Sequence, residues 1–209
     1  MRNIINIFGW YSLPIELLFA TLVYIKQLDY QKRKPQIRIT IVGLIAAIII
    51  LSPLFFSGSA EKIENWNMLA LSIVYSIACY VILVVVIYAI ADISIQDILY
   101  IANSSYLTQH LIHCANLEIC AFFKMTDNSY IEIMCFAIGY VLCYFKVAPA
   151  LISEKGCKKQ SLQELGTTFG VIAVAISLSA VVKELSIENR VLYMSCVAYA
   201  MIFCFYALW

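Results

Sequence analysis

Long apolar stretches separated by short polar ones dominate the sequence. Each apolar stretch is continuous over about 18 residues or more, the length that predicts a membrane-spanning helix. The strands of a membrane barrel would instead alternate apolar and polar residues over about ten positions. The expected spans are Ile4–Ile25, Ile39–Phe56, Met68–Ala91, Ile98–Phe123, Ile131–Ile152, Leu165–Val182 and Val191–Trp209.

These spans predict an all-α fold, a polytopic transmembrane helical bundle that forms one domain over residues 1–209. Helices are expected because lipid offers no partner to unpaired backbone groups. The number of spans is about seven, or six if the weakest one, the fifth, does not cross. The third and fourth are joined by a very short turn, Asp92 to Asp97, and Tyr24 and Tyr30 are expected at one membrane interface.

Composition supports the same class. Hydrophobic residues make up 63% of the chain and charged residues 13%, against about 45–50% and about 25% in soluble domains. A soluble enzyme, a disordered tail and a nucleic-acid-binding protein are therefore disfavoured. The eight cysteines form no CxxC pair, so we expect neither a structural zinc site nor any other metal or cofactor.

The distribution of basic residues predicts the orientation. With seven spans, nine of the fourteen lysines and arginines fall on one side of the membrane. The positive-inside rule makes that side cytoplasmic, which puts the N-terminus outside and the C-terminus inside the cell membrane. The nine are Lys26, Lys32, Arg33, Lys34, Arg38, Lys146, Lys155, Lys158 and Lys159.

The fourth stretch carries most of the polar chemistry. Helical spacing places Asn103, Tyr106, His110 and His113 near one side, and Gln109 on an overlapping stripe. Polar groups in lipid are costly and usually face a bundle interior, and the carboxylate of Glu16 is a plausible partner for them. The candidate sensing residues are Glu16, Asn103, Gln109, His110, His113 and Glu118.

Three interpretations of this stretch stay open. The polar side chains could be hydrogen-bonding contacts between helices, worth about 0.6–2 kcal/mol each, or they could line a cavity that senses a ligand. They could also be catalytic, with His113 activating the Cys120 thiol. Those two residues are two turns apart, about 10.5 Å along a straight helix, so we expect no catalytic residue and no enzymatic activity.

Two glycines of the sixth stretch, Gly166 and Gly170, have the spacing of a helix-contact motif. Such spacing is common by chance. We expect it to serve packing within the chain rather than a dedicated dimer contact.

Several stretches together resemble a known family. The chain is similar to the N-terminal multi-helix sensor region of Firmicutes sensor histidine kinases of the GHKL ATPase class, relatives of the accessory-gene-regulator peptide receptors. Gln109 and His110 lie in the most specific of these stretches. The stretches that carry the resemblance are LPIELLFATLVY, QKRKPQIR, DISIQDILYIANSSYLTQHLIH, YVLCYFKVAP and RVLYMSCVAYAMIFCFYALW.

The resemblance implies a membrane sensor that detects an extracellular or intramembrane signal and relays it to a cytoplasmic output. In that family the sensor precedes a dimerisation helix and an ATP-binding domain, whereas this sequence stops at Trp209. The expected partners are the lipid bilayer, a peptide or small-molecule ligand, and a second copy or an output domain, with no nucleic acid. Two alternatives are an accessory-gene-regulator-type cysteine peptidase, using His113 and Cys120, and the substrate-binding subunit of a small-solute transporter.

Overall fold

The computed structural model describes residues 2–28, 66–123, 129–153, 156–157 and 161–182, with residues 193, 195–200 and 202–203. Its elements are nearly all helical, which confirms the all-α class. The long helices are α1 (Arg2–Ile25), α3 (Trp66–Ile90), α4 (Ile95–Phe122), α5 (Ser129–Leu142) and α7 (Leu162–Val182). A π-helix, η1 (Cys143–Val147), continues α5 into a short helix, α6 (Ala148–Leu151).

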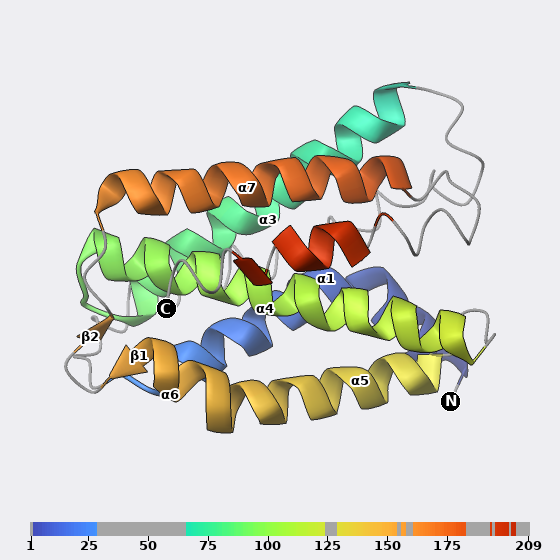
Figure 1. Cartoon of the computed structure of the whole chain (residues 1–209), viewed down its shortest axis with the longest axis horizontal. Coiled ribbons are helices and arrows are strands. Elements are labelled where there is room, and N and C mark those ends of the chain that lie inside the picture. The colour runs from blue at the N-terminus through green and yellow to red at the C-terminus, as the bar shows by residue number, and fades with distance from the viewer. Residues whose placement is uncertain are drawn as a thin grey trace.

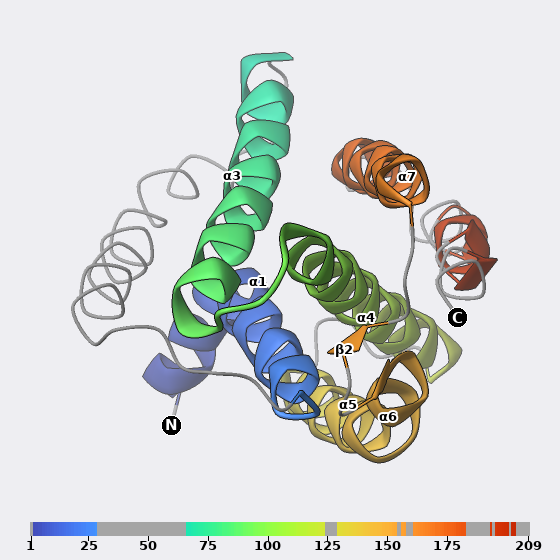
Figure 2. The same cartoon turned by 90° about the vertical axis from the view of Figure 1, so that its left-hand side faces the viewer.

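Helix α4 forms the centre of the bundle. It packs against α1, α3, α5 and α7, and the view along the bundle shows these four arranged around it (Figure 2). Seen from the side, α4 runs between α7 and α5 over most of its length (Figure 1). The helix that is most polar in sequence is therefore the one surrounded by the others.

The expected spans agree with the described helices to within a few residues. Helices α1, α3, α4 and α7 correspond to the first, third, fourth and sixth stretches, and α5 with its continuation corresponds to the fifth. The turn expected at Asp92 to Asp97 ends earlier than predicted, because α4 begins at Ile95. The second span and most of the basic residues counted above lie outside the described residues, as does Tyr30.

Capping explains where α4 and α7 begin. The backbone N–H of Asp97 donates to Ser94 Oγ at 3.2 Å, and the Ser94 hydroxyl donates to Asp97 Oδ2 at 2.6 Å. Ser161 and Glu164 exchange the two bonds of a capping box, at 3.2 and 2.8 Å. Each pair satisfies backbone donors that a helix start leaves without an intrahelical acceptor.

The π-helix after α5 has a local cause. The N–H of Ala148 donates to the carbonyl of Cys143, five residues back, and the next donor in that register would be Pro149, which has no N–H. The carbonyl of Tyr144 would then lack its intrahelical donor. Gln27 Nε2 supplies one, at 3.2 Å, which joins the end of α1 to the end of α5.

A two-stranded hairpin leads from α6 towards α7. Strand β1 (Ile152–Ser153) pairs antiparallel with β2 (Gly156–Cys157), and the N–H of Cys157 donates to Asp97 Oδ1 at 3.3 Å. The hairpin, the start of α4 and the end of α1 therefore share one end of the bundle, on the left in Figure 1. This is the arrangement that alternating spans require for these connections.

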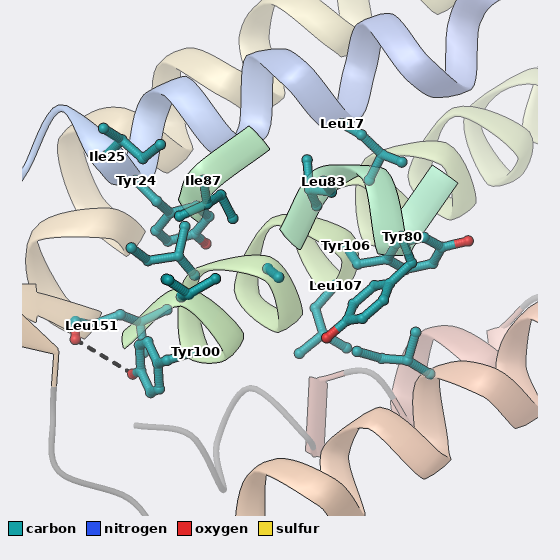
Figure 3. Packing of buried hydrophobic residues seen from close by; sticks show 14 of the residues in the cluster. Leu17, Tyr24, Ile25, Tyr80, Leu83, Ile87, Tyr100, Tyr106, Leu107 and Leu151 are labelled. Carbon is teal, nitrogen blue, oxygen red and sulfur yellow. Dashed lines mark hydrogen bonds between the residues drawn. The ribbon is translucent and has the colours of Figure 1, made fainter. Parts of the chain in front are cut away.

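The apolar core lies where α1, α3 and α4 meet. Leucine, isoleucine and tyrosine side chains of the three helices interdigitate there, and the Tyr100 hydroxyl donates to the carbonyl of Leu151 at 3.4 Å (Figure 3). Tyr24 is fully buried in this core. The expectation that it sits in an interfacial belt is therefore wrong; its ring faces the bundle interior and not a membrane surface.

The outer faces of the helices are apolar. On α3 the exposed side chains recur at helical spacing, as they do on α5 and η1. One helical stretch among those described, Ile133–Leu151, is long and apolar enough to cross a membrane, and Leu13–Ile25 and Val74–Ile90 are shorter apolar helices. The exposed stripes comprise Val74, Ile77, Val81, Val85 and Tyr88, and Met134, Ile138, Val141, Leu142 and Phe145.

The two glycines of α7 make no close helix contact within the described part of the chain, where packing was expected of them. A methyl group added at Gly166 or Gly170 would meet no atom within 4 Å in the described part of the chain. At Gly139 on α5, by contrast, the added methyl would lie 2.8 Å from a side-chain carbon of Ile112. The close approach of helices that glycine permits occurs between α4 and α5.

Cys157 is expected to react slowly with thiol reagents. Burial, and then the neighbouring Asp97 carboxylate, raise the pKa of its thiol well above the ordinary value, and only the thiolate is nucleophilic. Replacing Asp97 by asparagine removes the second cause, so the midpoint of the pH profile for maleimide labelling of Cys157 should move down. Mass spectrometry of the labelled peptide measures this. A rate increase with an unchanged midpoint would instead indicate that the hairpin had opened.

Candidate functional site

The centre of α4 is both polar and buried. Residues 101–110 are all buried, and they include Asn103, Thr108, Gln109 and His110. A helix enclosed on every side has no solvent-facing stripe for such groups, so their partners must come from neighbouring helices. The hydrogen bonds of Asn103, Thr108 and Gln109 form three clusters, each joining α4 to a different set of helices.

The first, the Glu16 cluster, consists of Glu16, Gln109 and Tyr140. Gln109 Nε2 donates to Glu16 Oε2 at 2.7 Å, and the Tyr140 hydroxyl donates to the backbone carbonyl of Glu16 at 2.8 Å. Both side chains of the first pair are buried. The pairing of Glu16 with the polar stripe of the fourth stretch is thus confirmed, and it joins α1, α4 and α5.

The second, the Tyr24 cluster, consists of Tyr24, Thr108 and Cys143. The hydroxyls of Tyr24 and Thr108 lie 2.7 Å apart, and the Cys143 thiol is 3.6 Å from the Tyr24 oxygen. The cluster joins α1 and α4 to the first residue of the π-helix. It lies about one helical turn along α1 from Gln27, which also bonds the π-helix.

The third, the Asn103 cluster, consists of Asn103, Tyr80 and the backbone of Leu165. Asn103 Oδ1 accepts from the Tyr80 hydroxyl, and its Nδ2 donates to the Leu165 carbonyl at 3.2 Å. One amide side chain thereby connects α4 to α3 and to α7. The Tyr80 ring also packs against Phe169 of α7, with centroids 4.9 Å apart.

The two histidines extend from the Asn103 side of α4. The rings of Tyr106 and His110 are stacked, with centroids 6.4 Å apart and an interplanar angle of 19°. The ring centroids of His110 and His113 are 6.5 Å apart. Tyr106 in turn contacts the Tyr80 ring at 5.9 Å. His110 is buried, whereas His113 is half-buried. Tyr106, His110 and His113, which are predicted on one side with Asn103, form a row of ring contacts, and Tyr80 joins that row to Asn103.

Glu118 lies apart from these clusters. It is exposed near the end of α4, and its Oε1 accepts from the Ser195 hydroxyl at 2.8 Å. Helix α4 continues without interruption past His113 to Phe122, so its backbone separates residues 113 and 120 by about 10.5 Å of helical rise. The side chain of Cys120 lies outside the described residues. Within the described part of the chain, no group of three metal-ligating side chains comes together.

Several members of the clusters were not expected from the sequence. Tyr24, Tyr80 and Tyr140 resemble the other aromatic residues of apolar spans, and Thr108 and Cys143 are small residues that lipid tolerates. A usable signal is present nevertheless: a tyrosine well inside an apolar span must bring its hydroxyl to a partner. The best acceptors available are the amides and hydroxyls of the fourth stretch.

Comparison with known proteins gives no further assignment: no family model, no curated protein and no solved structure matches the chain.

Proposed function

We propose that the chain is a multi-pass membrane sensor in which signal binding shifts α4 relative to the surrounding helices. The observation that carries the proposal is the set of three clusters on one central helix. Because of these clusters, a displacement of α4 changes the contacts of α1, α3, α5 and α7 together. A ligand can shift α4 from one position to another only if it binds the protein with different affinity in the two positions.

The membrane location rests on an inverted distribution of polarity. Soluble proteins bury apolar side chains and expose polar ones, whereas here the outer stripes of α3 and α5 are apolar and the central helix is polar. Helices α1, α3, α4 and α7 have 24, 25, 28 and 21 residues, and about 20 residues span the hydrocarbon core. The proposed topology has seven spans with the N-terminus outside.

The end of the bundle that holds the hairpin is the cytoplasmic one in this topology. It carries exposed Lys26 and Lys146, and both belong to the basic side of the sequence count. The proposed sensing residues are Glu16, Asn103, Gln109, His110 and His113, and the resemblance to GHKL-class sensor regions favours a histidine kinase as the output.

A deletion and complementation experiment tests the sensor role. Deleting the gene should change the transcription of a defined set of genes when cells are given conditioned medium, and the wild-type gene should restore it. The variant with Gln109→Leu and His110→Leu, present in the membrane at the wild-type level, should leave the deletion profile unchanged. The matched control Glu164→Gln alters an exposed helix cap and should restore the response.

Full restoration of the transcriptional response by the double variant would overturn the sensor proposal. Normal maturation of a co-expressed precursor peptide in a Cys120→Ser strain would separately remove the peptidase alternative.

A further inference from the structure

Pro149 removes one backbone hydrogen bond from the π-helix η1 and would remove one from an α-helix in the same place. In the π register the N–H of Ala148 donates to the carbonyl of Cys143, and the next carbonyl, of Tyr144, faces the missing N–H of Pro149. In an α register Ala148 would donate to Tyr144, and the carbonyl of Phe145 would face Pro149 instead. The register therefore decides which of two carbonyls lacks a backbone donor.

A side chain of α1 serves one of these two carbonyls. Gln27 Nε2 donates to the carbonyl of Tyr144 at 3.2 Å, which is the carbonyl that the π register leaves. In the α register the N–H of Ala148 would serve Tyr144, and the Gln27 bond would do nothing for Phe145. Since an acceptor left without a donor is costly, Gln27 favours the π register over the α register.

The end of α1 also holds the first residue of the π-helix and connects it to α4. The Tyr24 oxygen lies 3.6 Å from the Cys143 thiol and 2.7 Å from the Thr108 hydroxyl. The backbone N–H of Gln27 donates to the carbonyl of Tyr24 at 3.1 Å, so the two residues belong to one turn and move together. A displacement of α4 that pulls on Tyr24 would therefore draw Gln27 away from Tyr144.

The register of the π-helix sets the rotation of the chain that follows it, which is α6 and the hairpin (Figure 1). A return to the α register would turn these residues by one position around the helix, about 100°. The Leu151 carbonyl would then leave the Tyr100 hydroxyl, from which it accepts at 3.4 Å. The hairpin would also leave Asp97, whose Oδ1 accepts from the N–H of Cys157 at 3.3 Å.

We propose that the π-helix is a register switch that Gln27 holds in the π form. When the end of α1 withdraws Gln27, the segment returns to the α register and displaces the hairpin from the start of α4. The contacts on both sides of the switch carry the proposal, because α1 binds its first two residues and the hairpin follows its last one. The part of this switch in signalling rests on the proposed sensor function, for which it supplies the step between α4 and the cytoplasmic end.

The test follows the Tyr144 carbonyl by NMR of the full chain in lipid nanodiscs. Phenylalanine follows tyrosine only at Tyr144–Phe145 in the sequence, so tyrosine labelled at its carbonyl carbon and ¹⁵N-phenylalanine give a single cross-peak. Pro149→Ala supplies the missing N–H and should adopt the commoner α register, which gives the reference position of that peak. Gln27→Leu should move the peak from the wild-type position towards this reference.

A second measurement follows the hairpin. The rate at which maleimide labels Cys157 should rise by about tenfold in Gln27→Leu and in Pro149→Ala, because a buried thiol reacts through local opening. The matched control is Gln96→Leu, the same change at an exposed residue of the same end of the bundle. It should leave both the cross-peak and the labelling rate at their wild-type values.

A cross-peak that stays at the wild-type position in Gln27→Leu, or an unchanged Cys157 rate in both variants, would overturn the proposal. If Gln27→Leu alone does not fold, the double variant with Pro149→Ala decides, because it has a backbone donor for every carbonyl of the segment. It should fold and show the reference peak, and a double variant that also fails to fold would overturn the proposal. A register change that persists while the transcriptional test fails would leave the switch intact and remove only the sensor role.

Discussion

Replacing Asn103 by leucine is expected to lower the free energy of unfolding by about 2 kcal/mol, because the buried Tyr80 hydroxyl loses its acceptor. The substitution also removes the donor to the Leu165 carbonyl on α7. Equilibrium unfolding in mixed detergent micelles measures the change. In a Tyr80→Phe background the same substitution should cost about 1 kcal/mol less, since the hydroxyl is then absent.

The neighbouring Ser104 provides the matched control. Its hydroxyl is fully buried and without a partner in the described part of the structure, so Ser104→Ala should leave the stability unchanged or raise it. If Asn103→Leu and Ser104→Ala change the stability equally, the Asn103 cluster does not hold α3, α4 and α7 together.

Gly139→Ala is expected to destabilise the protein by about 1–2 kcal/mol, although alanine favours a helix more than glycine does. The added methyl would lie 2.8 and 2.9 Å from two side-chain carbons of Ile112, so the Ile112 side chain must leave its position or α4 and α5 must move apart. The same unfolding measurement applies, and Ile112→Ala in the Gly139→Ala background should recover most of the loss.

Gly170→Ala is the comparison for this substitution. Its methyl meets nothing within 4 Å in the described residues, so the stability should rise by about 0.5–1 kcal/mol through helix propensity alone. A loss of stability at Gly170 equal to that at Gly139 would show that the α7 glycines also form a close helix contact.

The sequence predicts the helices well because an apolar run long enough to span lipid has few other structures open to it. It also predicts the pairing of Glu16 with the fourth stretch, since an isolated carboxylate in an apolar span must find a polar neighbour. The position of Glu118 was less predictable: it shares a helix with Gln109, but nine residues place it near the end of α4, at Ser195. The hydrophobic pattern does not show which part of a helix is covered by the neighbouring helices.

The Tyr24 cluster is a second feature that the sequence does not predict. Thr108 and Cys143 follow Tyr24 by 84 and 119 positions in the sequence. Each of the three is an ordinary residue of an apolar span. Only the meeting of three helices turns a tyrosine, a threonine and a cysteine into one polar contact. The same holds for Gln27 and the π-helix, because Pro149 predicts an interrupted helix but not the side chain that satisfies the carbonyl it leaves.

The enclosed position of α4 has a consequence for biosynthesis. In the proposed multi-pass topology, α4 entering the bilayer alone would present Asn103, Gln109 and His110 to lipid, which opposes insertion. The partners of two of them, Tyr80 for Asn103 and Glu16 for Gln109, lie on α3 and α1. Both helices precede α4 in the chain and so are made before it. Under that topology, the order of synthesis would supply α4 with polar partners on its arrival, and α5 and α7 would then pack around it.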